Sequence, residues 1–306
     1  MNSYKLYGVL MIILGAFFYA TKAIFIKMGF RDTPQDGLDL LMLRMVFSFP
    51  FYFVVLISTT RKKNRENSSL PNFKEHFVIA STGFLGYYLA SYWDFVGLQY
   101  ITANLERLIL FIYPSVVLVF GALFYKRKIT QTQLIAMFIC WAGIGIAYYS
   151  DKAVNLNNNQ FKGSIFVLAA GIAYGLYLSL SENVINKFGS MYYTALSMVV
   201  SCVSVFVHYF VVKGFEPLFQ MTDHAYLLGL AIAFFSTVIP AFLMAEGIQR
   251  IGSGNMAIIG TIGPIITILL SINILGEKFT ANHFAGTFLV LISIYLIAQN
   301  QVKKVE

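Results

Sequence analysis

Long apolar runs separated by short polar connectors make up nearly the whole chain. Each run is close to the roughly 20 helical residues that cross about 30 Å of hydrocarbon. The runs cover residues 6–28, 38–57, 77–97, 103–124, 134–149, 163–183, 192–212, 226–247, 255–275 and 284–298. The longest connector, residues 58–76, is polar and basic and too short for a separate soluble domain. The pattern predicts an all-α membrane protein with ten transmembrane helices.

The second half of the chain repeats part of the first. A shift of 150 positions places Gly97-Leu98-Gln99-Tyr100-Ile101 on Gly247-Ile248-Gln249-Arg250-Ile251, Pro114 on Pro264, and Lys128-Ile129-Thr130 on Lys278-Phe279-Thr280. A shift of 155 also aligns Gly8 with Gly163 and Tyr19 with Tyr174. Soluble solenoids repeat every 20 to 50 residues or so, which is far shorter. We therefore predict two five-helix repeats, residues 1–150 and 151–306.

An odd number of crossings in each repeat makes the two repeats antiparallel. Such inverted repeats place a binding site near the middle of the bilayer, at the interface between the copies. When the copies exchange conformations, a cavity open to one side becomes a cavity open to the other. The layout therefore favours a transporter that works by alternating access.

Composition and charge agree with a lipid environment. The chain is 58% hydrophobic and 12% charged, against roughly 25% charged in soluble domains, and its mean hydropathy is +0.70. Most of the 22 lysines and arginines fall on the side of the N-terminus, including Arg61-Lys62-Lys63 and Lys126-Arg127-Lys128. This bias predicts a multi-pass protein with both termini in the cytoplasm. It also accounts for the net charge of +8, so nucleic acid is not an expected partner.

Enzyme motifs are absent from the sequence. It has no glycine-rich loop followed by Lys-Ser/Thr, no His-Glu-x-x-His and no nucleophile elbow. Cys140 and Cys202 have no spacing typical of a metal site and are expected to be packing residues. We expect no enzymatic activity, no cofactor and no metal, and an ion or substrate gradient as the energy source.

Charged residues inside the apolar runs are the sharpest candidates for a site. Lys22, Arg44, Asp94, Glu106 and Arg107 all lie within roughly 9 Å of the outer ends of their helices. Charges at such depth usually pair with one another or line a water-filled path. Their net charge of +1 suits a carboxylate-bearing substrate, with the acids as counter-charges or as amine or proton partners. The alternative is a set of structural salt bridges and headgroup contacts.

Other candidates are less direct. Tyr19 and Tyr174 occupy equivalent positions and are expected to form walls of the cavity. Glu246 is a separate candidate for an inner gate or proton site, and the alternative is an interfacial acid near Arg250.

Prolines and glycines mark expected helix breaks. The expected breaks are Pro114 in the fourth run and Gly260, Gly263 and Pro264 in the ninth. Each proline lies about 15 to 18 Å into its run and frees the carbonyl four residues earlier. The alternative is an ordinary proline kink between packed helices.

The chain resembles an EamA-type member of the drug/metabolite transporter superfamily over nearly its whole length. The residues that carry the resemblance are Phe18-Tyr19-Ala20-Thr21-Lys22-Ala23-Ile24-Phe25-Ile26-Lys27, Leu43-Arg44-Met45, Leu105-Glu106-Arg107-Leu108-Ile109-Leu110-Phe111-Ile112-Tyr113-Pro114, Gly260-Thr261-Ile262-Gly263-Pro264 and Gly276-Glu277-Lys278. The resemblance implies a carrier of the bacterial inner membrane with a central cavity between both halves. Tyr19-Ala20 stands where many relatives have Trp-Gly, which implies a different pocket chemistry.

These observations predict a secondary active transporter that exports small polar or amphipathic metabolites, amino-acid-like or carboxylate-bearing. The expected partners are a small-molecule substrate, protons and the lipid bilayer, and a homodimer is left open. One alternative is a phosphorylated-sugar or nucleotide-sugar exchanger of the same superfamily. A more remote alternative is a membrane-embedded sensor or lipid-modifying enzyme.

Overall fold

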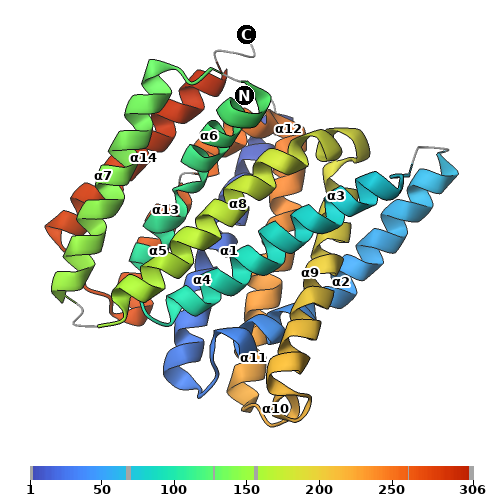
Figure 1. Cartoon of the computed structure of the whole chain (residues 1–306), viewed down its shortest axis with the longest axis horizontal. Coiled ribbons are helices and arrows are strands. Elements are labelled where there is room, and N and C mark those ends of the chain that lie inside the picture. Colours follow the sequence, from blue (N-terminus) through green and yellow to red (C-terminus); the bar gives the residue numbers. More distant parts are fainter. Residues whose placement is uncertain (1–2, 67–69, 127, 155–157, 261, 303–306) are drawn as a thin grey trace.

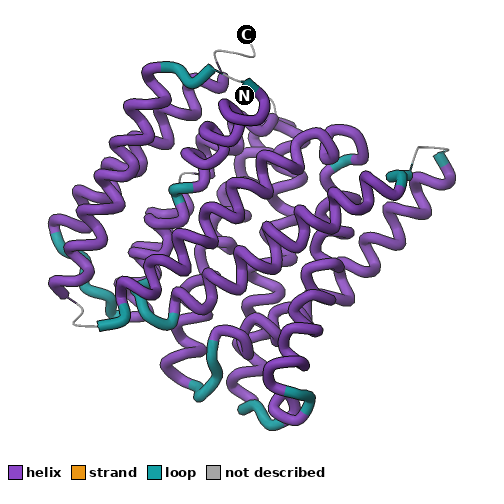
Figure 2. Tube along the Cα trace, viewed as in Figure 1, coloured by secondary structure: helices purple, strands orange, loops and turns teal. Residues whose placement is uncertain are grey.

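The computed structural model describes residues 3–66, 70–126, 128–154, 158–260 and 262–302, and these residues form helices joined by short loops (Figures 1 and 2). The first half contains α1 (Ser3–Asp32), α2 (Gly37–Arg65), α3 (Phe73–Gly83), η1 (Phe84–Leu89), α4 (Ala90–Leu98), α5 (Ala103–Leu110), α6 (Tyr113–Tyr125) and α7 (Gln131–Val154). The second half contains α8 (Gln160–Phe188), α9 (Ser190–Lys213), α10 (Glu216–Phe219), α11 (Asp223–Ala233), η2 (Phe234–Val238), α12 (Ile239–Gly260), α13 (Ile262–Leu270), η3 (Ser271–Leu275) and α14 (Ala281–Val302). The prediction of an all-helical protein is confirmed for the described residues.

Seven helices of the described chain are long and apolar enough to cross a membrane. They are Tyr4–Asp32, Gly37–Arg65, Ala103–Tyr125, Gln131–Lys152, Gln160–Ser181, Ser190–Lys213 and Asp223–Met244, and Ile262–Leu275 and Ala281–Ile297 are shorter apolar helices. The predicted third run, residues 77–97, consists of α3, the π-helical η1 and α4 in succession. The connector expected at residues 248–254 is helical, as part of α12.

Local structure recurs between the halves at the same spacing of 150 residues as the sequence. Thr130 and Gln133 form a capping box at the start of α7, with Thr130 N donating to Gln133 Oε1 at 3.0 Å. Thr280 and His283 do the same at the start of α14, where Thr280 N lies 3.2 Å from His283 Nδ1. Each half also contains a π-helical segment at an equivalent position, η1 at 84–89 in the first half and η2 at 234–238 in the second.

The backbone at the ends of α6 and η3 gives a further match. Lys126 has φ 54° and ψ 26°, and Gly276, 150 positions later, has φ 67° and ψ 24°. Both residues therefore end their helix in the left-handed conformation, which is unusual for lysine and ordinary for glycine. Lys126 is the one non-glycine residue with a positive φ among those described. The recurrence of this helix-ending geometry 150 residues later indicates that the two halves share the same local backbone structure at these positions.

The helices pair across the two halves. In Figure 1, α7 and α14 lie side by side along one edge, and α1 packs on α12 as α8 packs on α4. Helix α2 packs on α9, and the N- and C-terminal ends lie at the same end of the bundle (Figure 1). The pairs α1 with α12 and α4 with α8 are equivalent under the sequence repeat, so the packing repeats as well.

Glycines bring these helix pairs into close contact. A Cβ atom on Gly97 would lie 2.9 Å from the carbonyl oxygen of Gly163, and one on Gly247 would lie 3.2 Å from that of Gly8. These two crossings occupy equivalent positions in the two repeats. Small residues at a crossing let two helices approach closely in a membrane, where van der Waals packing holds helices together.

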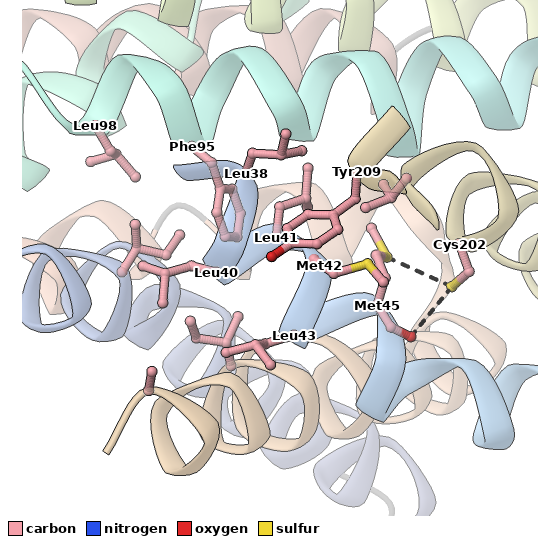
Figure 3. Close-up of a cluster of buried hydrophobic side chains, with 14 of the residues drawn as sticks. Leu38, Leu40, Leu41, Met42, Leu43, Met45, Phe95, Leu98, Cys202 and Tyr209 are labelled. Atoms are coloured by element: carbon pink, nitrogen blue, oxygen red, sulfur yellow. Dashed lines mark hydrogen bonds between the residues drawn. The ribbon is translucent and has the colours of Figure 1, made fainter. Parts of the chain in front are cut away.

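The largest buried core surrounds the first half of α2. Figure 3 shows Leu38, Leu40–Leu43 and Met45 of α2 packed with Phe95 of α4 and with Cys202 and Tyr209 of α9. The Cys202 thiol donates a weak hydrogen bond to the carbonyl oxygen of Met45 at 3.8 Å. Cys140 and Cys202 are both buried and unpaired by a disulfide, so they pack within the bundle.

The crossing of α7 and α14 gives a testable prediction. A Cβ on Gly143 would lie 2.7 Å from the carbonyl oxygen of Gly286, while one on Gly145, two residues away, meets no atom within 4 Å. Gly143→Ala should therefore lower stability by roughly 1–3 kcal/mol through overpacking. The matched control Gly145→Ala should leave stability unchanged or raised. Thermal unfolding of the detergent-purified proteins measures both, and equal melting temperatures would contradict the packing described.

Candidate functional site

A lysine held between two carboxylates lies deep in the bundle. Lys22 Nζ of α1 is 2.6 Å from Asp94 Oδ2 of α4 and 3.1 Å from Glu106 Oε1 of α5. The three residues are 6%, 4% and 0% exposed, respectively. We call Lys22, Asp94 and Glu106 the ion triad. It joins three helices from the first half of the chain through one ammonium group.

The start of α5 positions Glu106. The hydroxyl of Thr102 caps α5 by accepting from Leu105 N at 3.2 Å, and the same hydroxyl donates to Asp151 Oδ1 at 2.8 Å. Glu106 therefore lies in the first turn of a capped helix, where the helix dipole favours a negative charge. Sequence reasoning named Glu106 but not the Thr102 and Asp151 contacts that fix its helix.

Arg107 lies beside the triad and is attached to two other helices. Its Nε donates to Thr267 Oγ1 of α13 at 3.2 Å, and its Nη2 lies 3.4 Å from the carbonyl oxygen of Tyr19. Both Arg107 and Lys22 lie over the ring of Tyr19, at 5.4 and 5.9 Å from its centroid. Tyr19 remains 42% exposed although it lies at the middle of α1. The structure thus brings Tyr19, Lys22, Asp94, Glu106 and Arg107 together.

Arg44 occupies a separate position. Its Nε donates to Thr237 Oγ1 of η2 at 2.9 Å and its Nη1 to Ser91 Oγ of α4 at 3.1 Å. The guanidinium lies 5.7 Å from the centroid of the Phe95 ring. None of the described carboxylates forms an ion pair with Arg44, although the residue is only 7% exposed. Arg44 therefore binds hydroxyl groups where the sequence suggested an acid.

Tyr174 lies in a group of tyrosines and not with the charges. Its ring centroid is 5.4 Å from that of Tyr113 and 5.7 Å from that of Tyr177. The hydroxyl of Tyr177 donates to that of Tyr87 at 2.9 Å. A shift of 155 residues aligns Lys22 with Tyr177, so the sequence repeat contained a signal for this group of tyrosines. The sequence analysis named only Tyr174 of the group.

Glu246 is paired locally. Its Oε1 accepts from Arg250 Nε at 2.9 Å and from Arg250 Nη2 at 2.7 Å, four residues along α12. The two side chains are 46% and 25% exposed. A local pair with Arg250 agrees with the alternative interpretation, and the role of Glu246 as an inner gate or proton site stays a prediction.

The backbone near the marked prolines is irregular in the first half. Helix α5 ends at Leu110, Phe111 N donates to Leu108 O at 3.1 Å, and Pro114 lies in the first turn of α6. In the second half Pro264 is buried in the first turn of α13, and a Cβ on Gly263 would enter open space. Gly260 is the last residue of α12, and residue 261 lies outside the described part of the chain.

A set of polar contacts lies at one end of the bundle. The Glu277 carboxylate accepts from Ala103 N at 2.7 Å and from Asn104 N at 3.2 Å, at the start of α5. Lys27 of α1 donates to the carbonyl oxygens of Leu98 and Ile101 at 3.2 and 3.0 Å. We call this end the outer end, following the orientation that the basic loops predict. The role of Glu277 and Lys27 there was not anticipated from spacing.

Metal binding receives no support from the described residues. They contain no group of three or more His, Cys, Asp or Glu side chains placed to hold an ion.

The ion triad gives the second prediction. Removing one partner of a buried ion pair leaves an uncompensated charge, which typically costs about 3–5 kcal/mol. Lys22→Met should therefore strongly lower the melting temperature of the purified protein. The neutral triple variant Lys22→Met/Asp94→Asn/Glu106→Gln should recover most of the loss, because no unpaired charge remains. A triple variant as unstable as Lys22→Met would show that the three charges do not compensate one another.

Comparison with known proteins identifies the family. The model of the EamA-like transporter family matches residues 6–149 and again residues 161–299. The chain is 26% identical over 277 residues to the uncharacterized transporter YcbK of Bacillus subtilis, covering 89% of this chain and 86% of YcbK. It is 23% identical over 303 residues to protein RarD of Salmonella typhimurium, covering 96% and 95%. One solved crystal structure, 13% identical, has the same fold with a TM-score of 0.60 and covers 96% of this chain and 97% of that one. With its apolar helices and two family matches that span nearly the whole length, the chain belongs to the EamA-like transporter family and is a multi-pass membrane transporter.

Proposed function

We propose that the chain is a secondary active transporter that exports small polar or amphipathic metabolites across the bacterial inner membrane by alternating access. The single observation that carries the proposal is the ion triad with Arg107 and the exposed Tyr19 at its side, enclosed by apolar helices. Charges so deep in a membrane protein are rare and usually line a substrate or ion path.

The contacts at the outer end support two antiparallel repeats, residues 1–150 and 151–306. Glu277 follows the ninth predicted crossing, and it contacts Ala103 and Asn104, which begin the fourth. The fourth and ninth crossings are equivalent under the repeat, so the end of one meets the beginning of the other. Equivalent helices that meet end to beginning run in opposite directions. An odd number of crossings in each repeat gives this arrangement, and we take α3–η1–α4 as the third of ten crossings and α13–η3 as the ninth.

The positions of the charged and aromatic groups support an alternating mechanism. The ion triad, Arg107 and the Glu277 contacts tie α1, α4, α5, α13 and the segment after η3 together near the outer end. In this conformation the outer end is closed by polar contacts. Opening it requires these contacts to separate, and exchange of conformation between the repeats supplies such a movement. Substrate charges that replace the separated partners lower the cost of opening.

The orientation is tested by a matched pair of cysteines. Lys128 and Lys278 are both exposed and stand 150 residues apart, so inverted repeats place them on opposite faces of the membrane. In a background with Cys140→Ala and Cys202→Ala, a membrane-impermeant thiol reagent added to intact cells should label Lys278→Cys and leave Lys128→Cys unlabelled. Lysed cells, in which both should react, are the control. Labelling of both positions from one side would contradict the inverted arrangement.

Transport is tested with purified protein in liposomes. Vesicles loaded with a mixture of amino acids and organic acids should release carboxylate-bearing compounds through the wild-type protein, with the release compared with and without a pH gradient. Arg107→Ala and Glu106→Ala should abolish this release while both variants still insert into membranes. Arg61→Ala, at an exposed position near the end of α2, is the control and should transport normally. Normal transport by both site variants would place the substrate path elsewhere.

A further inference from the structure

The buried charges of the first half do not balance one another evenly. Lys22 is bound by both acids of the triad, and Arg107 directly follows Glu106 and shares the Tyr19 ring with Lys22. Lys22, Arg107, Asp94 and Glu106 carry no net charge as a group, although only Lys22 forms ion pairs with the two acids. The fifth charge is Arg44, which has no ion-pair partner among the described carboxylates. A charge that is 7% exposed in a membrane bundle without a counter-ion needs an explanation.

The guanidinium of Arg44 has unused hydrogen-bonding capacity. It carries five N–H groups, and the bonds to Thr237 and Ser91 occupy Nε and Nη1. Its Nη2 donates to no acceptor in the part of the chain that the structure describes. The unbonded oxygens of Asp94 and Glu106 are fully buried, whereas Nη2 of Arg44 is not among the fully buried side-chain atoms that lack a partner.

The surroundings of Arg44 hold its guanidinium in place without neutralising it. Leu43 and Met45 on either side are buried in the core shown in Figure 3, so the backbone of α2 is fixed there. Thr237 lies in η2, and its carbonyl oxygen accepts from Tyr52 Oη at 3.3 Å. A π-helical segment that presents polar groups to a buried charge is typical of functional positions.

The charged groups on neighbouring elements are already committed. Ser91, Asp94 and Phe95 share one face of α4, because they are spaced by three and four residues. On that face, Asp94 is the acid nearest in sequence to Ser91, and its Oδ2 lies 2.6 Å from Lys22 Nζ. On α2 itself, Asp39 binds Lys213 at 2.8 Å. An arginine that served only to tie helices together would be expected to use one of these acids, and Arg44 uses neither.

We propose that Arg44 is the anchor for the carboxylate of the transported molecule, with the hydroxyls of Ser91 and Thr237 beside it. The inference rests on the proposed transport function and names the substrate class, an organic carboxylate. Carboxylates fit the planar guanidinium fork through paired hydrogen bonds. The Phe95 ring, whose centroid lies 5.7 Å from Cζ of Arg44, is the aromatic neighbour of this anchor. The bound carboxylate supplies the negative charge that the protein does not place there.

Binding of small carboxylates to the purified full-length protein tests this proposal. Acetate and benzoate are the probes, benzyl alcohol is the uncharged control for benzoate, and chloride keeps the ionic strength constant. The melting temperature of the wild type should rise with carboxylate concentration and not with benzyl alcohol. Arg44→Gln should weaken this effect by roughly 10- to 100-fold, the range expected for a lost hydrogen bond to a charged group. Arg61→Gln, at an exposed position near the end of α2, is the control and should retain the effect.

Either of two results with the wild type and Arg44→Gln overturns the proposal. One is the absence of any carboxylate-specific rise in the wild type, and the other is an equal rise in Arg44→Gln. If Arg44→Gln does not fold, Arg44→Lys replaces it, because lysine keeps the charge and loses the planar fork. A concentration dependence in Arg44→Lys equal to that of the wild type would also overturn the proposal.

Vesicle transport separates this proposal from the broader one. Carboxylate binding through Arg44 without transport of any carboxylate would refute the transport function and leave the anion site standing. Transport that survives in Arg44→Gln with an unchanged half-saturating concentration would refute the anion site at Arg44 and leave the transport function standing.

Discussion

The fold depends on a single ammonium group shared by two buried carboxylates. Lys22, Asp94 and Glu106 come from three helices, and no one of them is tolerable in lipid without the others. Their pairing fixes how α1, α4 and α5 meet, and Arg107 extends the connection to α13 through Thr267. Polar contacts of Lys27 and Glu277 continue the same joint to the outer end. The apolar packing of the remaining helices surrounds this joint.

The two halves share a backbone design but not a chemistry. Helix caps, π-helical segments and left-handed helix ends recur at a spacing of 150 residues. The equivalents of Lys22, Asp94 and Glu106 in the second half are Tyr177, Met244 and Met256. The charged triad of the first half therefore has no charged counterpart at the equivalent positions in the sequence of the second half. In the proposed mechanism, the two ends of the pathway thus differ in the kind of interaction that must break.

Much of the fold follows from sequence, because each run of apolar residues needs only local information to be recognised. The five buried charges were also predictable, since an ionisable residue inside an apolar run is conspicuous. Which of these charges form ion pairs with one another was not predictable. Whether Arg44 meets Asp94 or Thr237 depends on how far α2 stands from α4, and that distance is set by packing around Leu43 and Phe95. The helical course of residues 248–254 was likewise missed, because these residues fall between two predicted apolar runs.

In the proposed mechanism, the ion triad holds the outer end of the bundle closed. The most direct measurement is the distance between spin labels on Arg31, at the end of α1, and Lys278, after η3, by pulsed electron paramagnetic resonance in liposomes. Cys140 and Cys202 are replaced by alanine so that only these positions carry a label. In the wild-type site one short distance should predominate, and in Lys22→Met/Asp94→Asn/Glu106→Gln a longer distance should gain population. Identical distance distributions in the two proteins would show that the triad does not control the outer end.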